Sequence, residues 1–325
     1  MPQITTVTLN PALDEAVALD RLELGGKNRC SLDSLDPGGK GVNASRVIAR
    51  LGGSTVAMMF SGGLTGDLLE EKLREEAVPF VAIRVDDATR VNITIYESAS
   101  GRRSRLYLPG ARIRSAHLRE LEGRLDAVPA RGVVVLGGSV PPGAPPWIYR
   151  DLIVRLKERG VRCVVDTSGE ALSYALEAHP ALVKPNVEEA SQLLGIALDD
   201  DDAVFDAALK MHQRGAEQVV ISQGSLGAIG VNAIGAWKAV PPEIRSRSTV
   251  GSGDSMVAGL AIALDENQSL VEGLRLGSAA GAATALIAAT RLCRREDVVS
   301  LLPQVVIREL RAPGLAHPVK EKVVC

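Results

Sequence analysis

Short apolar segments alternate with amphipathic segments along most of this 325-residue chain. Runs such as Ile4–Leu9, Thr55–Phe60 and Val161–Asp166 are typical of buried strands, and between them lie segments with the period of a helix, such as Gly41–Leu51. Apolar strands separated by helices predict a mostly parallel sheet covered on both faces, which is a three-layer α/β/α fold. The further expected elements are strands at 132–136, 182–184 and 218–222 and helices at 66–76, 147–159, 187–194 and 203–214.

Two stretches, Ala16–Ser34 and Val91–Leu108, interrupt this alternation. Residues Ile93–Tyr96 alternate between apolar and polar side chains, which is typical of a strand with one exposed face. We therefore expect antiparallel strands that stand off the main sheet. With 46% hydrophobic residues, the chain can bury one sizeable domain or two small ones.

Composition argues against a nucleic-acid or membrane surface. The formal net charge is −2, from 37 Lys and Arg against 39 Asp and Glu, and aromatic residues make up only 3%. The cysteines Cys30, Cys163, Cys293 and Cys325 lack the spacing of zinc ligands or of a disulfide framework. The start of the chain lacks a secretory signal pattern, and the charge-free stretch 276–290 is shorter than a membrane span. We expect a soluble, cytoplasmic protein whose 276–290 stretch is a buried core helix.

The run Ser248–Gly259 leads from turn-forming glycines directly into an apolar helical pattern. Gly251 and Gly253 lack a Cβ, so backbone amides at the helix start can approach a phosphate closely. Asp254 would repel that anion, but it can take a proton from a nucleophile that attacks the phosphate. The alternative is a glycine turn followed by an ordinary Asp helix cap.

A second glycine run, Gly39–Ala44, matches the relaxed dinucleotide fingerprint G-x-G-x-x-A but lacks the acidic residue expected about 20 positions later. The sequence contains no P-loop motif. Two other interpretations remain open for this run. Gly38, Gly39 and Asn43 can bind sugar hydroxyl groups, or the run is simply the glycine-rich start of a helix.

Five motifs occur in order, and together they resemble the PfkB (ribokinase-like) carbohydrate kinases, in the phosphofructokinase and tagatose-phosphate kinase branch. They are Asn10–Asp14, Pro37–Asn43, Gly138–Gly143, Val183–Glu189 and Thr249–Asp254. Further segments are similar to the minor class of bacterial 6-phosphofructokinases, at 26–30, 89–90, 108–110, 166–172 and 290–293. The resemblance implies a ribokinase-like domain over residues 1–312, with a β lid from about 14–36 and 90–109, and a loosely ordered tail over 313–325.

The resemblance implies ATP- and Mg²⁺-dependent phosphorylation of a ketohexose phosphate, with fructose 6-phosphate as the favoured substrate. Tagatose-6-phosphate kinase and 1-phosphofructokinase share the same apparatus and remain alternatives. A sugar-phosphate sensor without catalytic activity is a further alternative, although the intact Asp254 speaks against it. A dinucleotide-dependent enzyme would rest on Gly39–Ala44 alone.

Asp254 is the expected general base, and the amides of Gly251, Ser252 and Gly253 are the expected anion hole. By resemblance, Asn186 and Glu189 organise Mg²⁺ and its waters, with Lys184 nearby. The spacing of Asn186 and Glu189 equally fits a capping box at a helix start.

The sugar phosphate is expected in the N-terminal half. By resemblance Asp14 accepts hydrogen bonds from sugar hydroxyl groups, and Arg90 suits the substrate phosphate because its planar fork can bind two oxygens. Further candidates are Arg105, Lys27, Arg29 and Ser139, although any single Arg or Lys is more often a solvated surface charge. In relatives the lids of two subunits pair, so a homodimer through the lid strands is expected.

The expected nucleotide residues follow from the resemblance. They are Ser222, Gly224, Ser225, Gly227, Ser246 and Ser278. Many relatives also bind K⁺ beside the anion hole, and the matching positions here are Ser248, Val250, Thr284, Ile287 and Ala289, with Arg291 nearby. Because Leu286–Ala289 replaces a more polar stretch of the relatives, the sequence leaves K⁺ dependence undecided.

Overall fold

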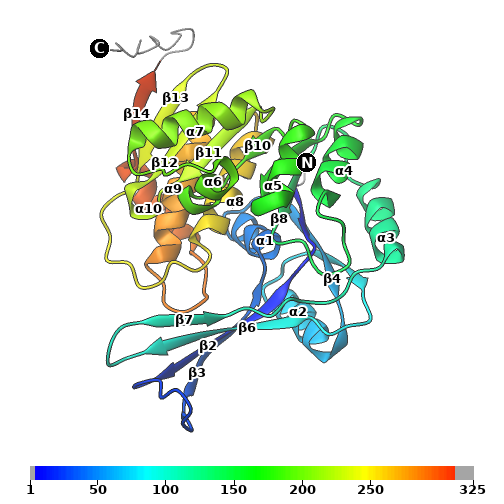
Figure 1. Cartoon of the computed structure of the whole chain (residues 1–325), viewed down its shortest axis with the longest axis vertical. Helices are drawn as coiled ribbons and strands as arrows, with labels where there is room; N and C mark the ends of the chain where they lie inside the picture. Colours follow the sequence, from blue (N-terminus) through cyan, green and yellow to red (C-terminus); the bar gives the residue numbers. More distant parts are fainter. Residues whose placement is uncertain (1–3, 312–325) are drawn as a thin grey trace, which may run out of the picture.

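The computed structural model describes residues 4–311, which form a large sheet covered by helices and a smaller sheet that projects from one end of this body (Figure 1). The predicted loosely ordered tail, 313–325, lies outside the described residues. No helix within residues 4–311 is long and apolar enough to cross a membrane.

The central sheet has ten strands in the order β14-β13-β12-β11-β10-β9-β8-β1-β4-β5. The strands from β11 to β5 in this order run parallel, which confirms the mostly parallel sheet. They are β1 (Ile4–Thr8), β4 (Thr55–Ser61), β5 (Phe80–Arg84), β8 (Val133–Gly137), β9 (Arg162–Asp166), β10 (Leu182–Val183) and β11 (Gln218–Ser222). The remaining strands are antiparallel: β12 (Ala228–Asn232), β13 (Ala236–Val240) and β14 (Val306–Arg311).

Helices cover both faces of this sheet (Figure 1). They are α1 (Lys40–Arg50), α2 (Gly63–Glu75), α3 (Ser115–Leu125), α4 (Ile148–Lys157), α5 (Gly169–Glu177), α6 (Val187–Leu194), α7 (Asp201–Gln213), α8 (Ser252–Asp265), α9 (Leu270–Ala285) and α10 (Arg295–Leu301). Successive strand residues point to opposite faces. Val134 and Leu136 therefore join the core of α3, α4, α5 and α7, while Val133 and Val135 join that of α1, α8, α9 and α10. Both faces of the strand are buried, as its apolar sequence predicts.

The smaller sheet, called the lid below, consists of β3 (Ser31–Gly38), β2 (Ala12–Leu19), β6 (Arg90–Glu97) and β7 (Arg103–Leu106), in that order. The expectation of antiparallel strands is correct for β2–β3 and β6–β7 but wrong for the central pair, because β2 and β6 are parallel. β2 follows β1 and β6 follows β5, and these two body strands point in the same direction. The two lid strands therefore leave the body side by side.

Close packing of α8 against α9 fixes the helix that carries the glycine run. A Cβ on Gly259 would lie 2.5 Å from the backbone nitrogen of Gly277, so only glycine permits this approach. The predicted core helix at 276–290 is confirmed in part, since α9 spans Leu270–Ala285 and its inner face is buried. This packing therefore fixes the position of the N-terminus of α8.

Candidate active site

The first turn of α8 presents unpartnered backbone amides. Gly251 caps the helix in the left-handed conformation, with φ of 76°, and a Cβ there would lie 2.4 Å from Leu292 Cδ2. Within residues 4–311, the amides of Gly251, Gly253 and Asp254 have no hydrogen-bond acceptor, whereas that of Ser252 donates to the Thr249 carbonyl at 3.4 Å. The amide cradle thus centres on Gly251, Gly253 and Asp254, and the predicted contribution of the Ser252 amide is already partly used.

Asp254 lies at the edge of this cradle. Its Oδ2 accepts a hydrogen bond from Asn43 Nδ2 at 2.7 Å, which brings the two glycine runs together across 211 residues. Asp254 is half-buried, and its carboxylate loses much of its hydration. This burial, together with the nearby charge of Asp166, raises the pKa of Asp254 to about 6. Lys40, Asn43 and Lys184 act in the opposite direction. A carboxylate with a pKa near 6 suits a proton acceptor at neutral pH.

Two lysines and two carboxylates surround the space in front of Asp254. Lys40 Nζ lies 2.9 Å from Asp166 Oδ1 and 3.2 Å from Glu189 Oε1, and the buried Lys184 Nζ lies 3.5 Å from Asp166 Oδ1. Burial alone would lower the pKa of Lys40, but the carboxylates of Asp166, Glu189 and Asp254 raise it above its ordinary value. Burial likewise opposes ionisation of Asp166, whose pKa is nevertheless held low by Lys184 and Lys40. Asp166 therefore holds both ammonium groups in place beside Asp254.

Asn186 and Glu189 form the capping box that their spacing predicts at the start of α6. Glu189 N donates to Asn186 Oδ1 at 2.8 Å, and Asn186 N donates to Glu189 Oε2 at 2.9 Å. Glu189 Oε1 accepts from Lys40. Since both oxygens of Glu189 already accept hydrogen bonds, the pair fits a hydrated Mg²⁺ contacted through water better than a direct ligand. No group of three or more His, Cys, Asp or Glu residues in the described part of the chain could hold a metal ion.

Asp14 lies where the lid meets the body. It is half-buried on β2, accepts a hydrogen bond from Asn92 Nδ2 at 2.8 Å, and packs so closely on Gly38 that a Cβ there would lie 2.2 Å from its Oδ2. Burial raises the pKa of Asp14. Gly39, with φ of 107°, caps α1 after the lid strand β3. A dinucleotide fingerprint would follow a strand of the central sheet, so this interpretation of the Gly39–Ala44 run is wrong.

Arg90 borders a cavity of about 600 Å³ together with Asn10, Ser139 and the 140–146 loop. Its guanidinium donates to the carbonyls of Asn10 and Leu108 at 2.9 Å each. Asn10 Nδ2 in turn donates to Ser139 Oγ at 3.0 Å. Burial lowers the pKa of Arg90, which still leaves it a cation. The structure thus brings the predicted Arg90 and Ser139 to one cavity, with Asn10 between them.

The other predicted cations lie elsewhere. Arg105 on β7 donates to Thr249 Oγ1 at 3.2 Å, so it contacts the loop before the amide cradle and not the Arg90 cavity. Lys27 and Arg29 are exposed on the loop between β2 and β3. Within one chain these two side chains are not assembled with Arg90.

The predicted nucleotide residues lie on three segments. Ser222 ends β11, and Gly224 and Ser225 follow in an exposed turn. Gly227 packs against the Ala239 carbonyl, where a Cβ would clash at 1.9 Å. Further segments supply Ser246, which is exposed, and Ser278, whose buried Oγ has no hydrogen-bond partner among the described residues.

The structure joins two of the predicted K⁺ positions, Ser248 and Ala289. Ser248 Oγ donates to the Ala289 carbonyl at 2.7 Å, which joins the loop before α8 to the loop after α9. Ala289 has φ of 62°, unusual for a residue other than glycine, so its carbonyl is turned by a strained backbone. Thr284 Oγ1 already bonds Ser255 Oγ and the Cys293 amide. Backbone carbonyls therefore fit a monovalent cation here better than the hydroxyl of Thr284. The remaining predicted residues of this set are Val250 and Ile287, with Arg291 bonded to the Asp33 carbonyl.

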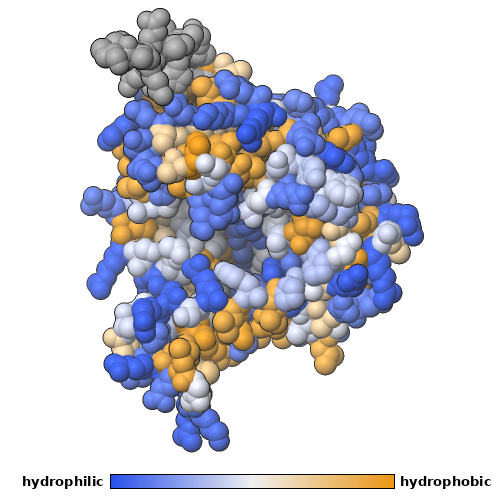
Figure 2. Space-filling view, in the orientation of Figure 1, coloured by the Kyte–Doolittle hydropathy of each residue, from blue (hydrophilic) through white to orange (hydrophobic). Residues whose placement is uncertain are grey.

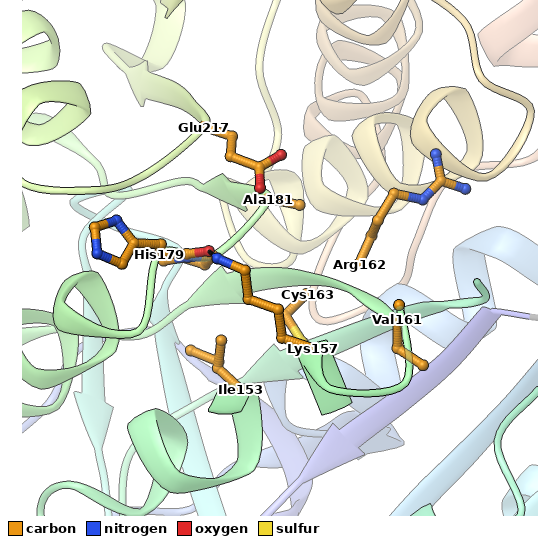
Figure 3. A pocket seen from close by; sticks show the side chains of 10 residues that line it. Ile153, Lys157, Val161, Arg162, Cys163, His179, Ala181 and Glu217 are labelled. Carbon is orange, nitrogen blue, oxygen red and sulfur yellow. Dashed lines mark hydrogen bonds between the residues drawn. The ribbon is translucent and has the colours of Figure 1, made fainter. Parts of the chain in front are cut away.

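A second hollow, of about 190 Å³, lies at the opposite edge of the sheet, where β9, β10 and β11 begin (Figure 3). Its Lys and Arg side chains bond protein groups: Lys157 Nζ donates to the His179 carbonyl at 3.1 Å and Arg162 to Asn267 Oδ1 at 2.9 Å. Asp166, Lys184 and Asp254 lie instead at the carboxyl ends of the strands, away from this hollow.

Comparisons with known proteins agree with this geometry. Residues 7–296 match the pfkB family carbohydrate kinases. The chain is 42% identical over 299 residues to ATP-dependent 6-phosphofructokinase isozyme 2 of Escherichia coli (strain K12), covering 91% of this chain and 97% of that protein. It is 34% identical to the 1-phosphofructokinase of Bacillus subtilis (strain 168), covering 94% and 100%. The crystal structure of the Escherichia coli phosphofructokinase-2 in complex with potassium superposes with a TM-score of 0.90 at 40% identity, covering 94% and 99%.

Proposed function

The chain belongs to the pfkB family of carbohydrate kinases, and we propose that it transfers the γ-phosphate of ATP to fructose 6-phosphate. The products would be fructose 1,6-bisphosphate and ADP. Asp254 at the edge of the bare amides of α8 is the observation that carries this proposal, because it places a proton acceptor beside an anion site. The described residues would act as one kinase domain composed of body and lid.

The proposed reaction is an in-line displacement. Asp254 accepts the proton of the sugar hydroxyl as its oxygen bonds the γ-phosphorus and the bond to ADP breaks. The amides of Gly251, Gly253 and Asp254 stabilise the charge on the equatorial oxygens. Lys40 and Lys184, held by Asp166, add two fixed cations around the same space. Because these groups are already fixed by one another, little reorganisation is needed at the moment of transfer.

Mg²⁺ with ATP is part of the proposal. The ion would neutralise charge on the donor phosphates, and Asn186 and Glu189 would hold its waters. Carbonyls of the loops at 248–250 and 287–289 would hold a K⁺ ion beside the cradle. The support for K⁺ is their convergence at the Ser248–Ala289 contact, and the Escherichia coli relative has been crystallised with potassium.

The proposed substrate site lies between body and lid. Asp14 and Gly38 would bind sugar hydroxyl groups, and the cavity beside Arg90 and Ser139 would receive the substrate phosphate. Matched relatives include both 6-phosphofructokinases and 1-phosphofructokinases. A 1-phosphofructokinase is therefore the second candidate, since the same catalytic groups would serve it.

Steady-state rates with fructose 6-phosphate, tagatose 6-phosphate, fructose 1-phosphate and unphosphorylated fructose test this proposal. We expect fructose 6-phosphate to give the highest kcat/KM. The matched control is Asp254→Asn, which should lower kcat roughly 10²- to 10⁴-fold with little change in ATP affinity. Faster turnover of the unphosphorylated sugar would refute the phosphate site, and binding of sugar phosphates without any turnover would favour the sensor alternative.

We also propose a homodimer through the lid. Large hydrophobic side chains are exposed on the lid and its loops: Leu24, Leu32, Leu106, Tyr107 and Leu108. Figure 2 shows apolar colour over this end of the molecule. In such a dimer Lys27 and Arg29 would lie at the interface. A related Escherichia coli structure is described as a tetrameric inhibited form, so sedimentation measurements must separate dimer from tetramer.

A further inference from the structure

Arg46 on α1 is an arginine buried to 1% exposure. Removing a guanidinium from water costs several kcal/mol unless its donors are satisfied by protein. Arg46 Nε donates to both carboxylate oxygens of Glu76 at 3.0 Å, and Nη1 donates to the Pro37 carbonyl at 2.7 Å. These bonds offset much of that cost and hold the guanidinium in one position.

One further contact of Arg46 leads toward Asp254. Arg46 Nη1 donates to Asn43 Oδ1 at 3.3 Å, one turn earlier on α1. The other end of the same amide, Asn43 Nδ2, donates to Asp254 Oδ2 at 2.7 Å. A continuous chain of hydrogen bonds therefore runs from Glu76 through Arg46 and Asn43 to Asp254.

The chemistry of these groups fixes the direction of the Asn43 amide. A guanidinium has donors and no acceptor, and an ionised carboxylate has acceptors and no donor. Only with Oδ1 toward Arg46 and Nδ2 toward Asp254 are both ends of the amide satisfied. The amide is thus held from both ends, with Arg46 binding Oδ1 and the ionised Asp254 accepting from Nδ2, and loss of Arg46 removes one of the two restraints.

We propose that Arg46 is a positioning residue for phosphoryl transfer: it orients the Asn43 amide so that its NH₂ group faces Asp254, while Glu76 anchors Arg46. This inference rests on the proposed function of Asp254 as the proton acceptor. It assigns a task in the reaction to a residue that touches neither proposed substrate.

Loss of this orientation should change the pKa of Asp254 in a predictable direction. The Asn43 hydrogen bond stabilises the charged form of Asp254, so its loss raises the pKa of Asp254 further above its ordinary value. The other charges facing Asp254 are Asp166 at the end of β9, Lys40 on α1 and Lys184 after β10, and none of them contacts Arg46. Their influence therefore stays constant when Arg46 is changed.

The test is the pH dependence of kcat at saturating MgATP and sugar phosphate. Arg46→Met should move the acid limb to higher pH by about one unit, the size expected for a lost hydrogen bond to a charged group. Asn43→Ala should move it similarly, and the double variant should move it no further, because both changes remove the same interaction. Phosphate groups of the substrates also titrate near pH 6, so each variant is compared with the unmodified enzyme on identical substrates.

Arg50→Met is the matched control. Arg50 lies one turn further along α1 and bonds the same Glu76 at 2.9 Å, but it does not contact Asn43. Its acid limb should stay in place. Glu76→Gln provides a milder variant should Arg46→Met fail to fold, and it should shift the limb in the same direction by a smaller amount.

An unshifted limb in a folded Arg46→Met or Glu76→Gln enzyme would overturn the inference. So would shifts that add up in the double variant, because Arg46 would then act through its charge alone. If the unmodified enzyme does not phosphorylate any sugar phosphate, the proposed function itself fails. A normal unmodified enzyme with unshifted variants removes only the role of Arg46.

Discussion

Gly253→Ala separates the catalytic use of the α8 amides from their contribution to stability. Gly253 lies in the first turn of α8 with a helical backbone, so alanine can adopt its conformation without strain. Outside the backbone of α8 itself, the only atom among residues 4–311 near the added Cβ is Lys184 Nζ at 3.6 Å, which is an ordinary contact. Replacing glycine by alanine at such a position stabilises a protein by about 0.4–1 kcal/mol, mainly through the unfolded chain.

The same methyl group would occupy the space proposed for the transferring phosphate. A phosphate oxygen needs about 2.7–3.0 Å to both an amide nitrogen and the Lys184 ammonium. A methyl carbon 3.6 Å from that ammonium leaves no room for such an oxygen between them. Loss of one donor from an anion hole lowers kcat by about 10²- to 10³-fold, and we expect at least the lower figure.

Thermal unfolding and steady-state kinetics on the same preparation provide the assay. Gly253→Ala should unfold at the same temperature or a few degrees higher while kcat falls about 100-fold. Gly251→Ala is the companion variant, because its φ of 76° and a Cβ position 2.4 Å from Leu292 Cδ2 predict a loss of stability as well. A Gly253→Ala enzyme with unimpaired kcat would show that no phosphate occupies the space over these amides.

The charges of Arg90 and Asp254 lead to three further predictions. Arg90→Ala should chiefly raise KM for the sugar phosphate, and an unchanged KM would show that Arg90 only braces the Asn10 and Leu108 carbonyls. Because the pKa of Asp254 is raised to about 6, kcat should fall as the pH drops through 6, which rate profiles will check. Since burial raises this pKa above 3.8, Asp254 opposes folding once ionised. Asp254→Asn should therefore raise the unfolding temperature above pH 6, and the gain should vanish below pH 4; a constant difference would contradict this.

The parallel body could be predicted because its information is local. Each buried strand is an apolar run, and each helix carries its own period, so Val133–Gly137 and α6 are readable in isolation. The antiparallel edge was not predicted. Its β13–β14 pair joins strands more than 60 residues apart and leaves no local signal, whereas β11–β12 and β12–β13 are local hairpins whose pattern was overlooked. The parallel centre of the lid was missed for a similar reason, since β2 and β6 are joined only through the body.

The sequence predicted Asp254 and the α8 glycines but not the ion pairs of Lys40 in front of them. Asp254 and the α8 glycines carry a local signal, a turn followed at once by a helix. Lys40 lies within the predicted Gly38–Asn43 motif but was not singled out, because its partners Asp166 and Glu189 are 126 and 149 residues away. Residue spacing cannot reveal such pairs. A lysine between glycines at the start of a helix was the available signal.

The lid touches both loops that flank the α8 cradle, and this arrangement links the two proposed binding sites. Arg103 donates to the Arg247 carbonyl, and Arg105 donates to Thr249 Oγ1 in the loop that leads to Gly251. On the other side of the lid, Asp36 accepts from Thr290 Oγ1, next to Ala289 with its strained backbone. Displacing the lid would therefore break contacts to the two loops that hold the cradle in place. A sugar at the proposed site under the lid and a phosphate at the proposed cradle would therefore depend on the same supporting contacts.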